Sequence, residues 1–91
     1  ICADTQAAKP GRWVLDCAAA AENILLAAHA LGLGACWVSS EPVPERITGF
    51  RQLVNLPENI HPVCLITVGY PAQTPSPEDR FQPERVHLNF W

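Results

Sequence analysis

Cysteine and histidine supply the side chains of this sequence that could ligate a metal ion or act as nucleophiles. The cysteines stand far apart, at Cys2, Cys17, Cys36 and Cys64. No CxxC pair and no Cys/His cluster offers the spacing that a zinc site requires. Each cysteine has apolar neighbours, so we expect buried, reduced thiols that behave as small hydrophobic side chains. The sequence therefore predicts no metal site, and it singles out no residue as catalytic.

The even number of cysteines would also allow two disulfides in a small secreted domain. Such domains are rich in loops, whereas this chain contains a long alanine-rich segment typical of a helix. We expect no leader resembling a signal peptide. We therefore expect a protein of the reducing cytoplasm.

Composition and charge exclude several classes of protein. Of the 91 residues 48% are hydrophobic and 16% charged, and the net charge is -3. This balance indicates one compact domain, or part of one, rather than a disordered segment. The basic residues are few and scattered, which argues against nucleic acid as a partner. The most apolar stretch, residues 14–33, contains Asp16, Glu22, Asn23 and His29, so we expect no membrane-spanning helix.

The first half of the chain predicts a strand, a long helix and a second strand. A strand end at residues 1–4 precedes a helix that begins near Trp13 and is stopped by Gly32 and Gly34. Residues 35–38 then predict a short buried strand, which opens into the polar loop Ser39-Ser40-Glu41-Pro42.

The second half predicts a shorter helix, a core strand and an extended tail. The helix begins at Pro44 and ends before Pro57, because proline disfavours the helical conformation of the residue before it. Residues 61–69 are continuously apolar at their centre, as expected for a strand covered on both faces. Prolines then forbid regular structure in the tail. The fold class that follows is α+β, with helices layered on a sheet.

Apolar residues occupy two arcs of the long helix, so we expect partners on two of its sides. Leu15, Ala19, Leu26 and Leu33 line one arc, and Val14, Cys17, Ala21, Ile24, Leu25, Ala28 and Leu31 line the other. We interpret His29, near Glu22, as a hydrogen-bonded structural histidine. Three short strands alone would leave much of this surface uncovered. A partner chain or a longer protein would cover it.

Four stretches, read together, resemble the C-terminal half of the FMN-dependent nitroreductase family. They are WVLDCAAAAEN at 13–23, AHALGLGACW at 28–37, VGYPA at 68–72 and RFQPERVH at 80–87. No single stretch is specific, but their order and spacing match across nearly the whole chain. The resemblance implies that residues 1–91 are the C-terminal portion of a single nitroreductase-like domain. They would form part of its mixed sheet flanked by helices, with an extended C-terminal tail.

The resemblance also implies a function. Members of this family are homodimers with FMN at the subunit interface, and they transfer hydride from NAD(P)H to small-molecule acceptors such as nitroaromatics and quinones by a ping-pong cycle. Their N-terminal half supplies further phosphate-binding residues that this chain does not contain. The flavin site on this chain alone would therefore be incomplete.

The family match assigns cofactor-binding roles to two parts of the sequence. Trp37, Val38, Ser39 and Ser40 would pass one face and edge of the flavin ring and offer main-chain N–H donors near its N5 atom. The alternative is that the two serines merely begin a turn, and Trp37 could equally fill the core. Arg85 would help to hold the FMN phosphate, for which a guanidinium is well suited.

Other polar residues receive simpler interpretations. Arg80 could also serve the phosphate, but a salt bridge to Asp79 or Glu78 is the simpler explanation. We assign no catalytic role to His61 or His87. The leading hypothesis is thus an FMN-dependent NAD(P)H oxidoreductase. The alternative is a non-catalytic fragment that binds flavin or completes a dimer.

Overall fold

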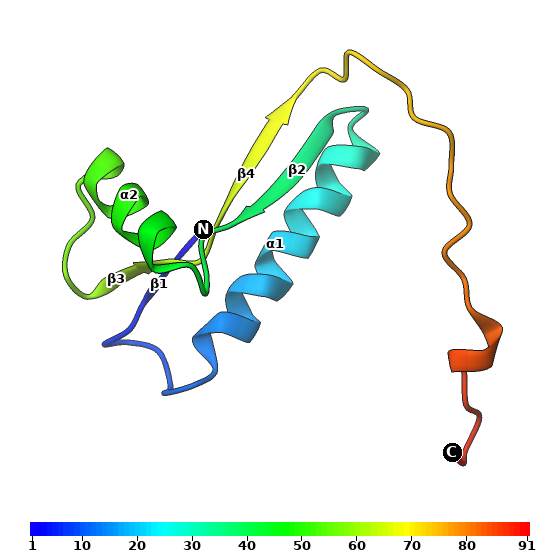
Figure 1. Ribbon diagram of the computed structural model, residues 1–91, viewed down its shortest axis with the longest axis horizontal. Helices are drawn as coiled ribbons and strands as arrows, with labels where there is room; N and C mark the ends of the chain where they lie inside the picture. The colour runs from blue at the N-terminus through cyan, green and yellow to red at the C-terminus, as the bar shows by residue number, and fades with distance from the viewer.

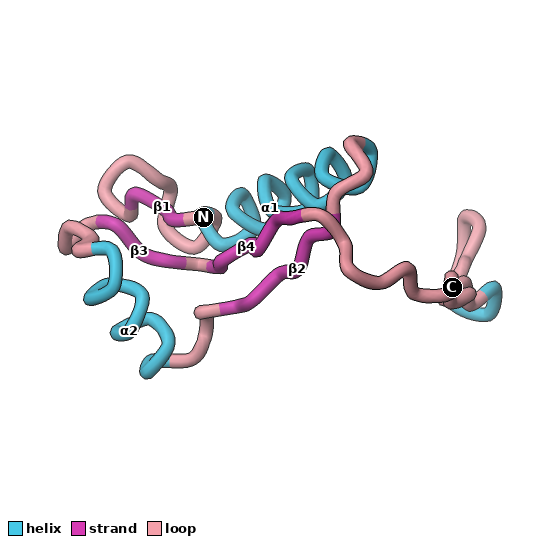
Figure 2. Tube along the Cα trace, turned by 90° about the horizontal axis from the view of Figure 1, so that it is seen from above, coloured by secondary structure: helices cyan, strands magenta, loops and turns pink.

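The computed structural model describes all of residues 1–91 and consists of short strands, two helices and a long tail. Its elements, in chain order, are β1 (Cys2–Asp4), α1 (Trp13–Ala30), β2 (Gly34–Ser39), α2 (Pro44–Val54), β3 (Ile60–Pro62), β4 (Cys64–Gly69) and the 3-10 turn η1 (Pro83–Arg85). The strands lie between α1 on one side and α2 on the other (Figures 1 and 2). The α+β class and the order of elements predicted from the sequence are confirmed.

The strands form two antiparallel pairs that meet at Val63. β2 pairs with β4 from Gly34 opposite Gly69 to Ser39 opposite Cys64. β1 pairs with β3 over three residues. The predicted single strand 61–69 is therefore interrupted at Val63, directly after Pro62, which has no N–H to donate to a ladder.

The backbone of Ile1 connects the two pairs. Its amino group donates to the Cys64 carbonyl at 2.7 Å, and its carbonyl accepts from the Val63 N–H at 3.0 Å. The small core lies at this junction, where Ala3, Cys17 and Val63 pack together with Ile1 and Trp13 against them.

Helix α1 packs on the strands through small side chains. Cys17, Ala21 and Ala28 are its buried residues, and their spacing puts them on one face of the helix. The two-sided cover predicted for this helix is not present in the chain, because Leu15 and Leu26 remain 70% and 58% exposed. The predicted cover on both faces of the core strand is likewise absent, since Leu65 and Val68 on β4 are exposed.

A left-handed glycine closes the end of α1. Gly32 has φ of +74°. Its N–H donates to the His29 carbonyl at 3.0 Å, and the Leu33 N–H donates to the Ala28 carbonyl at 2.9 Å. This pair of bonds is the Schellman motif, which satisfies carbonyls that the helix end leaves unpaired. The stop signal predicted at Gly32 is confirmed, as is the start of α2 at Pro44.

The expectation that all four thiols are buried is half wrong. Cys17 and Cys64 are buried, whereas Cys2 and Cys36 are exposed. Burial raises the pKa of the Cys17 and Cys64 thiols, and the neighbouring Cys64 raises that of Cys17 further. Both buried thiols are therefore protonated at neutral pH and behave as small apolar side chains.

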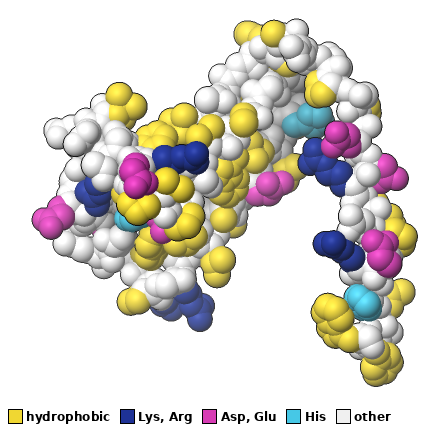
Figure 3. Space-filling view, in the orientation of Figure 1, with side chains coloured by type: hydrophobic (Ala, Val, Ile, Leu, Met, Phe, Trp, Pro, Cys, Tyr) yellow, Lys and Arg dark blue, Asp and Glu magenta, His cyan; other side chains and the backbone are white.

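The tail beyond Tyr70 runs away from the other elements (Figure 1). The radius of gyration is 16.6 Å, whereas a compact chain of this length would have about 12 Å. Phe81, Phe90 and Trp91 are all largely exposed, and hydrophobic side chains gather at the tail end as well as on the body (Figure 3). The tail thus presents apolar surface that nothing within the chain covers.

We predict opposite effects for two glycine substitutions. Gly32→Ala should destabilise the protein by about 1 kcal/mol, because an alanine resists the left-handed conformation. Gly49→Ala, inside α2, should stabilise it by about 0.5–1 kcal/mol. A Cβ atom added at either position meets no atom within 4 Å, so the backbone alone makes the difference. Denaturant unfolding of the full-length protein measures both, and equal stabilities would contradict the prediction.

A second substitution tests the packing of α1. Ala28 is 5% exposed, so Ala28→Phe should overpack the layer between helix and strands and cost about 1–3 kcal/mol. The neighbouring Ala27 is exposed, which makes Ala27→Phe the matched control. Thermal unfolding should show a lower melting temperature for the Ala28 variant only. A melting temperature equal to that of the wild type would mean that Ala28 does not face a packed layer.

Candidate functional site

The predicted cofactor segment lies where β2 ends and the chain turns toward α2. The Ser40 and Glu41 N–H groups both donate to the Val63 carbonyl, at 3.0 and 3.3 Å. Donors alternate between the two edges of a strand in an antiparallel ladder. The N–H groups of Val38 and Ser40 therefore face β4, and those of Trp37 and Ser39 face the free edge of β2.

The partner of Ser39 supports this alternation. Cys64 lies opposite Ser39, yet its N–H and carbonyl both bond to Ile1 rather than to β2. Of the four predicted segment residues, Trp37 and Ser39 thus have main-chain donors that no strand uses.

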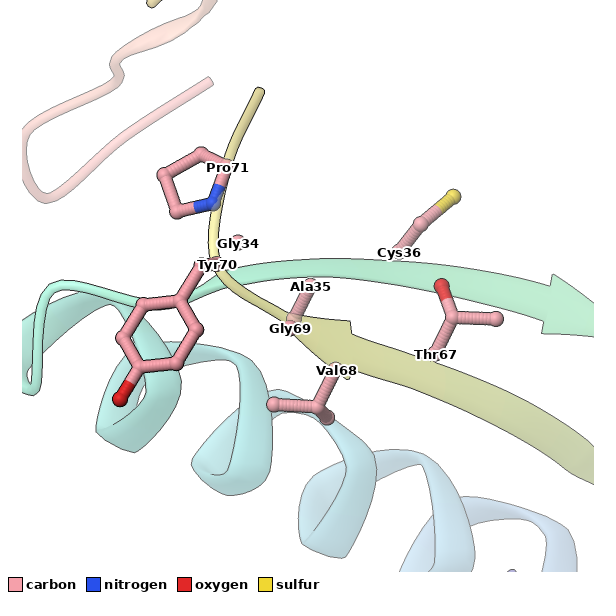
Figure 4. Close-up of a pocket in the computed structure, with 8 residues that line it drawn as sticks. All are labelled: Gly34, Ala35, Cys36, Thr67, Val68, Gly69, Tyr70 and Pro71. Atoms are coloured by element: carbon pink, nitrogen blue, oxygen red, sulfur yellow. The ribbon is translucent and has the colours of Figure 1, made fainter. Parts of the chain in front are cut away.

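The side chains of the segment alternate between two faces. Val68 points toward α1, whereas Cys36 and Thr67 point away from it (Figure 4). Residues paired across strands share a face, and Val68 pairs with Ala35. Trp37 and Ser39 consequently project on the α1 side, and both are half-buried.

Ser39 is held at two of its polar atoms. The Trp37 Nε1 donates to the Ser39 Oγ at 3.0 Å, and the Arg46 guanidinium donates to the Ser39 carbonyl at 3.0 Å. Its hydroxyl hydrogen and its main-chain N–H remain available. A fixed residue with two free, non-titrating donors suits an acceptor atom of a ligand.

Ser40 plays a different part from its neighbour. It is completely buried, and its Oγ donates to the Pro62 carbonyl at 2.9 Å. Its N–H and hydroxyl are both used inside the protein, so Ser40 anchors the segment to β3.

Sequence reasoning missed three residues around this strand end. Arg46, in the first turn of α2, reaches the Ser39 carbonyl. Glu41 and His61 form a 2.8 Å hydrogen bond across the loop, and the centroid of the Trp13 ring lies 4.8 Å from that of the imidazole. No local pattern reveals these contacts, because the partners are brought together only by the strand pairing.

Arg85 is not brought near this segment within the chain. It lies in η1, on the exposed tail, and Figure 1 shows that the tail leads η1 away from β2. Arg80 pairs with Glu78 at 3.3 Å, as predicted, and both side chains are largely exposed. His29 is exposed and has no hydrogen-bond partner within the chain, contrary to the hydrogen-bonded role predicted for it.

The hollows of the surface lie at the opposite end of the hairpin. One of about 390 Å³ is lined by eight residues around Gly34, Gly69 and Tyr70 (Figure 4). A larger one of about 550 Å³ lies between the end of α1 and the beginning of the tail. Neither includes Trp37 to Ser40, so the predicted segment is an open strand end rather than a cavity.

Two further features bear on the kind of site. No group of three or more His, Cys, Asp or Glu side chains lies close enough to hold a metal ion. Neither helix combines the length and the hydropathy needed to cross a membrane.

Comparison with known proteins identifies the family. Residues 3–70 match the model of the Nitroreductase family. The chain is 48% identical, over its whole length, to a protein of Methanothermobacter thermautotrophicus named "Putative NADH dehydrogenase/NAD(P)H nitroreductase", of which it covers 48%.

Solved structures agree with this match. A Bacteroides thetaiotaomicron protein of the same name is 42% identical, with a TM-score of 0.90 over 99% of this chain and 52% of that one. An FMN-dependent nitroreductase of Clostridium difficile is 27% identical, with a TM-score of 0.87 over 99% of this chain and 55% of that one.

The family match over residues 3–70 includes both helices and nearly all of the four strands. The chain spans about half the length of the curated relatives it matches. The resemblance drawn from its four sequence stretches is confirmed, and the chain belongs to the nitroreductase family.

Proposed function

We propose that the protein is an FMN-dependent NAD(P)H oxidoreductase, and that residues 1–91 form the C-terminal portion of its single nitroreductase-like domain. Names of relatives support this, because one is an FMN-dependent nitroreductase and another, from Bacillus subtilis, an FMN reductase (NADPH). Bound FMN would supply the hydride chemistry, taking hydride from NAD(P)H and passing it to a nitroaromatic, quinone or related acceptor. The free thiols support a cytoplasmic location.

The observation that most supports the proposal is the state of Ser39. Its carbonyl and hydroxyl oxygen are fixed by Arg46 and Trp37, whereas its N–H and hydroxyl hydrogen are free. Flavin N5 and the carbonyl oxygen beside it are acceptors, and neither donor titrates near neutral pH, so the donor set fits this edge of the cofactor. Ser39 and Trp37 would hold the flavin edge, Val38 would flank it, and Ser40 would anchor the segment that presents it.

The phosphate of FMN is assigned to Arg85. Its guanidinium makes no hydrogen bond or ion pair within the chain, and it can bind a phosphate through two parallel hydrogen bonds. Ser39 and Arg85 lie apart in one copy of the chain. We therefore propose a homodimer, in which the exposed leucines of α1 and the aromatic tail are buried and the tail of one copy reaches the strand end of the other.

We predict a yellow full-length protein that bleaches with NADPH under nitrogen and recovers its colour when a quinone or nitroaromatic is added. The visible spectrum measures each step, and denatured protein without flavin bands serves as the blank. Flavin bands that NADPH leaves unchanged would favour the non-catalytic alternative. Absence of flavin after reconstitution with FMN would refute the proposed function.

We also predict that Arg85→Ala weakens FMN binding about 10-fold to 150-fold, which corresponds to roughly 1.5–3 kcal/mol for a charge-assisted contact. Arg80→Ala is the matched control, because Arg80 lies on the same tail but already pairs with Glu78. Fluorescence titration of FMN into the apoprotein gives both affinities. Equal losses in the two variants would indicate a general effect of tail charge rather than a phosphate contact at Arg85.

A further inference from the structure

Two acidic side chains, Glu41 and Glu78, form a hydrogen bond with a basic side chain, and only the Glu41 pair is partly buried. Arg80 and Glu78 are 85% and 75% exposed, as expected of a weak surface pair. His61 and Glu41 are 22% and 29% exposed and lie 2.8 Å apart. A short hydrogen bond with little access to water holds its geometry better than an exposed pair.

The sheltered pair connects three elements. Glu41 follows β2 in the loop toward α2, His61 is the central residue of β3, and Trp13 begins α1. The Trp13 ring lies against the imidazole at 4.8 Å with a tilt of 54°. The aromatic contact limits the orientations of His61, so the carboxylate of Glu41 is held at a defined place on β3.

The pair lies close to the free donors along the chain. Glu41 is two residues after Ser39, and only Ser40 separates them. The backbone of this loop is held mainly by Val63, where the Glu41 N–H contact is the longer one at 3.3 Å. The Glu41 carboxylate and the Ser40 hydroxyl are the two side-chain contacts that fasten the loop to β3. The Val43 N–H closes the turn by donating to the Ser40 carbonyl at 2.8 Å, and the carboxylate is the contact that ties the Glu41 side chain to β3.

We propose that Glu41 and His61 are positioning residues, whose hydrogen-bonded pair holds the loop Ser39–Glu41 on β3 and so fixes the direction of the Ser39 donors. The effect on the cofactor rests on the proposed function. Flavin N5 accepts a hydrogen bond only when oxidised, because it carries its own hydrogen when reduced. Loosening the donors should therefore destabilise oxidised flavin relative to reduced flavin.

The test compares Glu41→Ala with Glu45→Ala in the full-length protein. Glu45 lies nearby in the first turn of α2, is exposed, and its side chain makes no hydrogen bond or ion pair. Hydrogen exchange measures protection of the Ser40 and Glu41 amides. In Glu41→Ala we expect these amides to exchange about fivefold to tenfold faster, as for loss of one hydrogen bond of ordinary strength. The Glu45 variant should match the wild type.

A second measurement distinguishes positioning from a purely structural contact. The reduction potential of bound FMN should become more positive in Glu41→Ala and stay unchanged in Glu45→Ala. Glu41→Gln keeps a hydrogen-bonding group of the same shape, so it should restore part of both properties. His61→Gln should behave like Glu41→Gln, and the double variant should add little, because the two residues act as one pair.

Each outcome decides the proposal. Unchanged amide exchange in Glu41→Ala would overturn it, because the pair would not hold the loop. Faster exchange with an unchanged potential would also overturn it, since the contact would then be structural only. If the wild-type protein binds no flavin, the proposed function and the effect on the potential fall together. Hydrogen exchange in Glu41→Ala would then still show whether the Glu41–His61 pair holds the loop Ser39–Glu41 on β3.

Discussion

The backbone of Val63 is the point on which the arrangement of the strands depends. Its carbonyl accepts the N–H groups of Ser40 and Glu41, and its own N–H donates to Ile1. One residue thus connects the β2–β4 pair to the β1–β3 pair. Val63 is also 3% exposed and belongs to the core with Ala3 and Cys17. Because a buried backbone group without a partner is costly, the loop after β2 has little freedom to leave this junction.

The candidate site follows from that constraint. The Ser40 N–H donates to Val63, and N–H groups alternate between the two edges of a strand. The Ser39 N–H therefore points to the free edge of β2. Trp37 and Arg46 then fix the remaining acceptors of Ser39, and the Glu41–His61 pair fastens the loop from the other side. Preorganised donors of this kind are valuable to a cofactor because they need no rearrangement when charge on the cofactor changes.

The surface of the chain shows a different constraint. Only 8 of 91 residues are buried, and large apolar side chains remain exposed on α1, β4 and the tail. Exposed apolar side chains of this kind are typical of surfaces that pack against further protein. The proposed dimer explains why Ser39 and Arg85 lie apart in one copy, since two parts of one site can come from different chains.

The sequence by itself determined the features that depend on a few neighbouring residues. Gly32 determines where α1 ends and Pro44 where α2 begins, in both cases through backbone conformation. The ordered stretches around α1 and β4 identified the family. Tertiary structure alone decided which serine is free and which is an anchor, and that Glu41 meets His61. The last pair is separated by 20 residues, and Ser40 and Pro62 by 22. Local propensity carries no information over such a distance, because the contact exists only after antiparallel pairing has set the register of the strands.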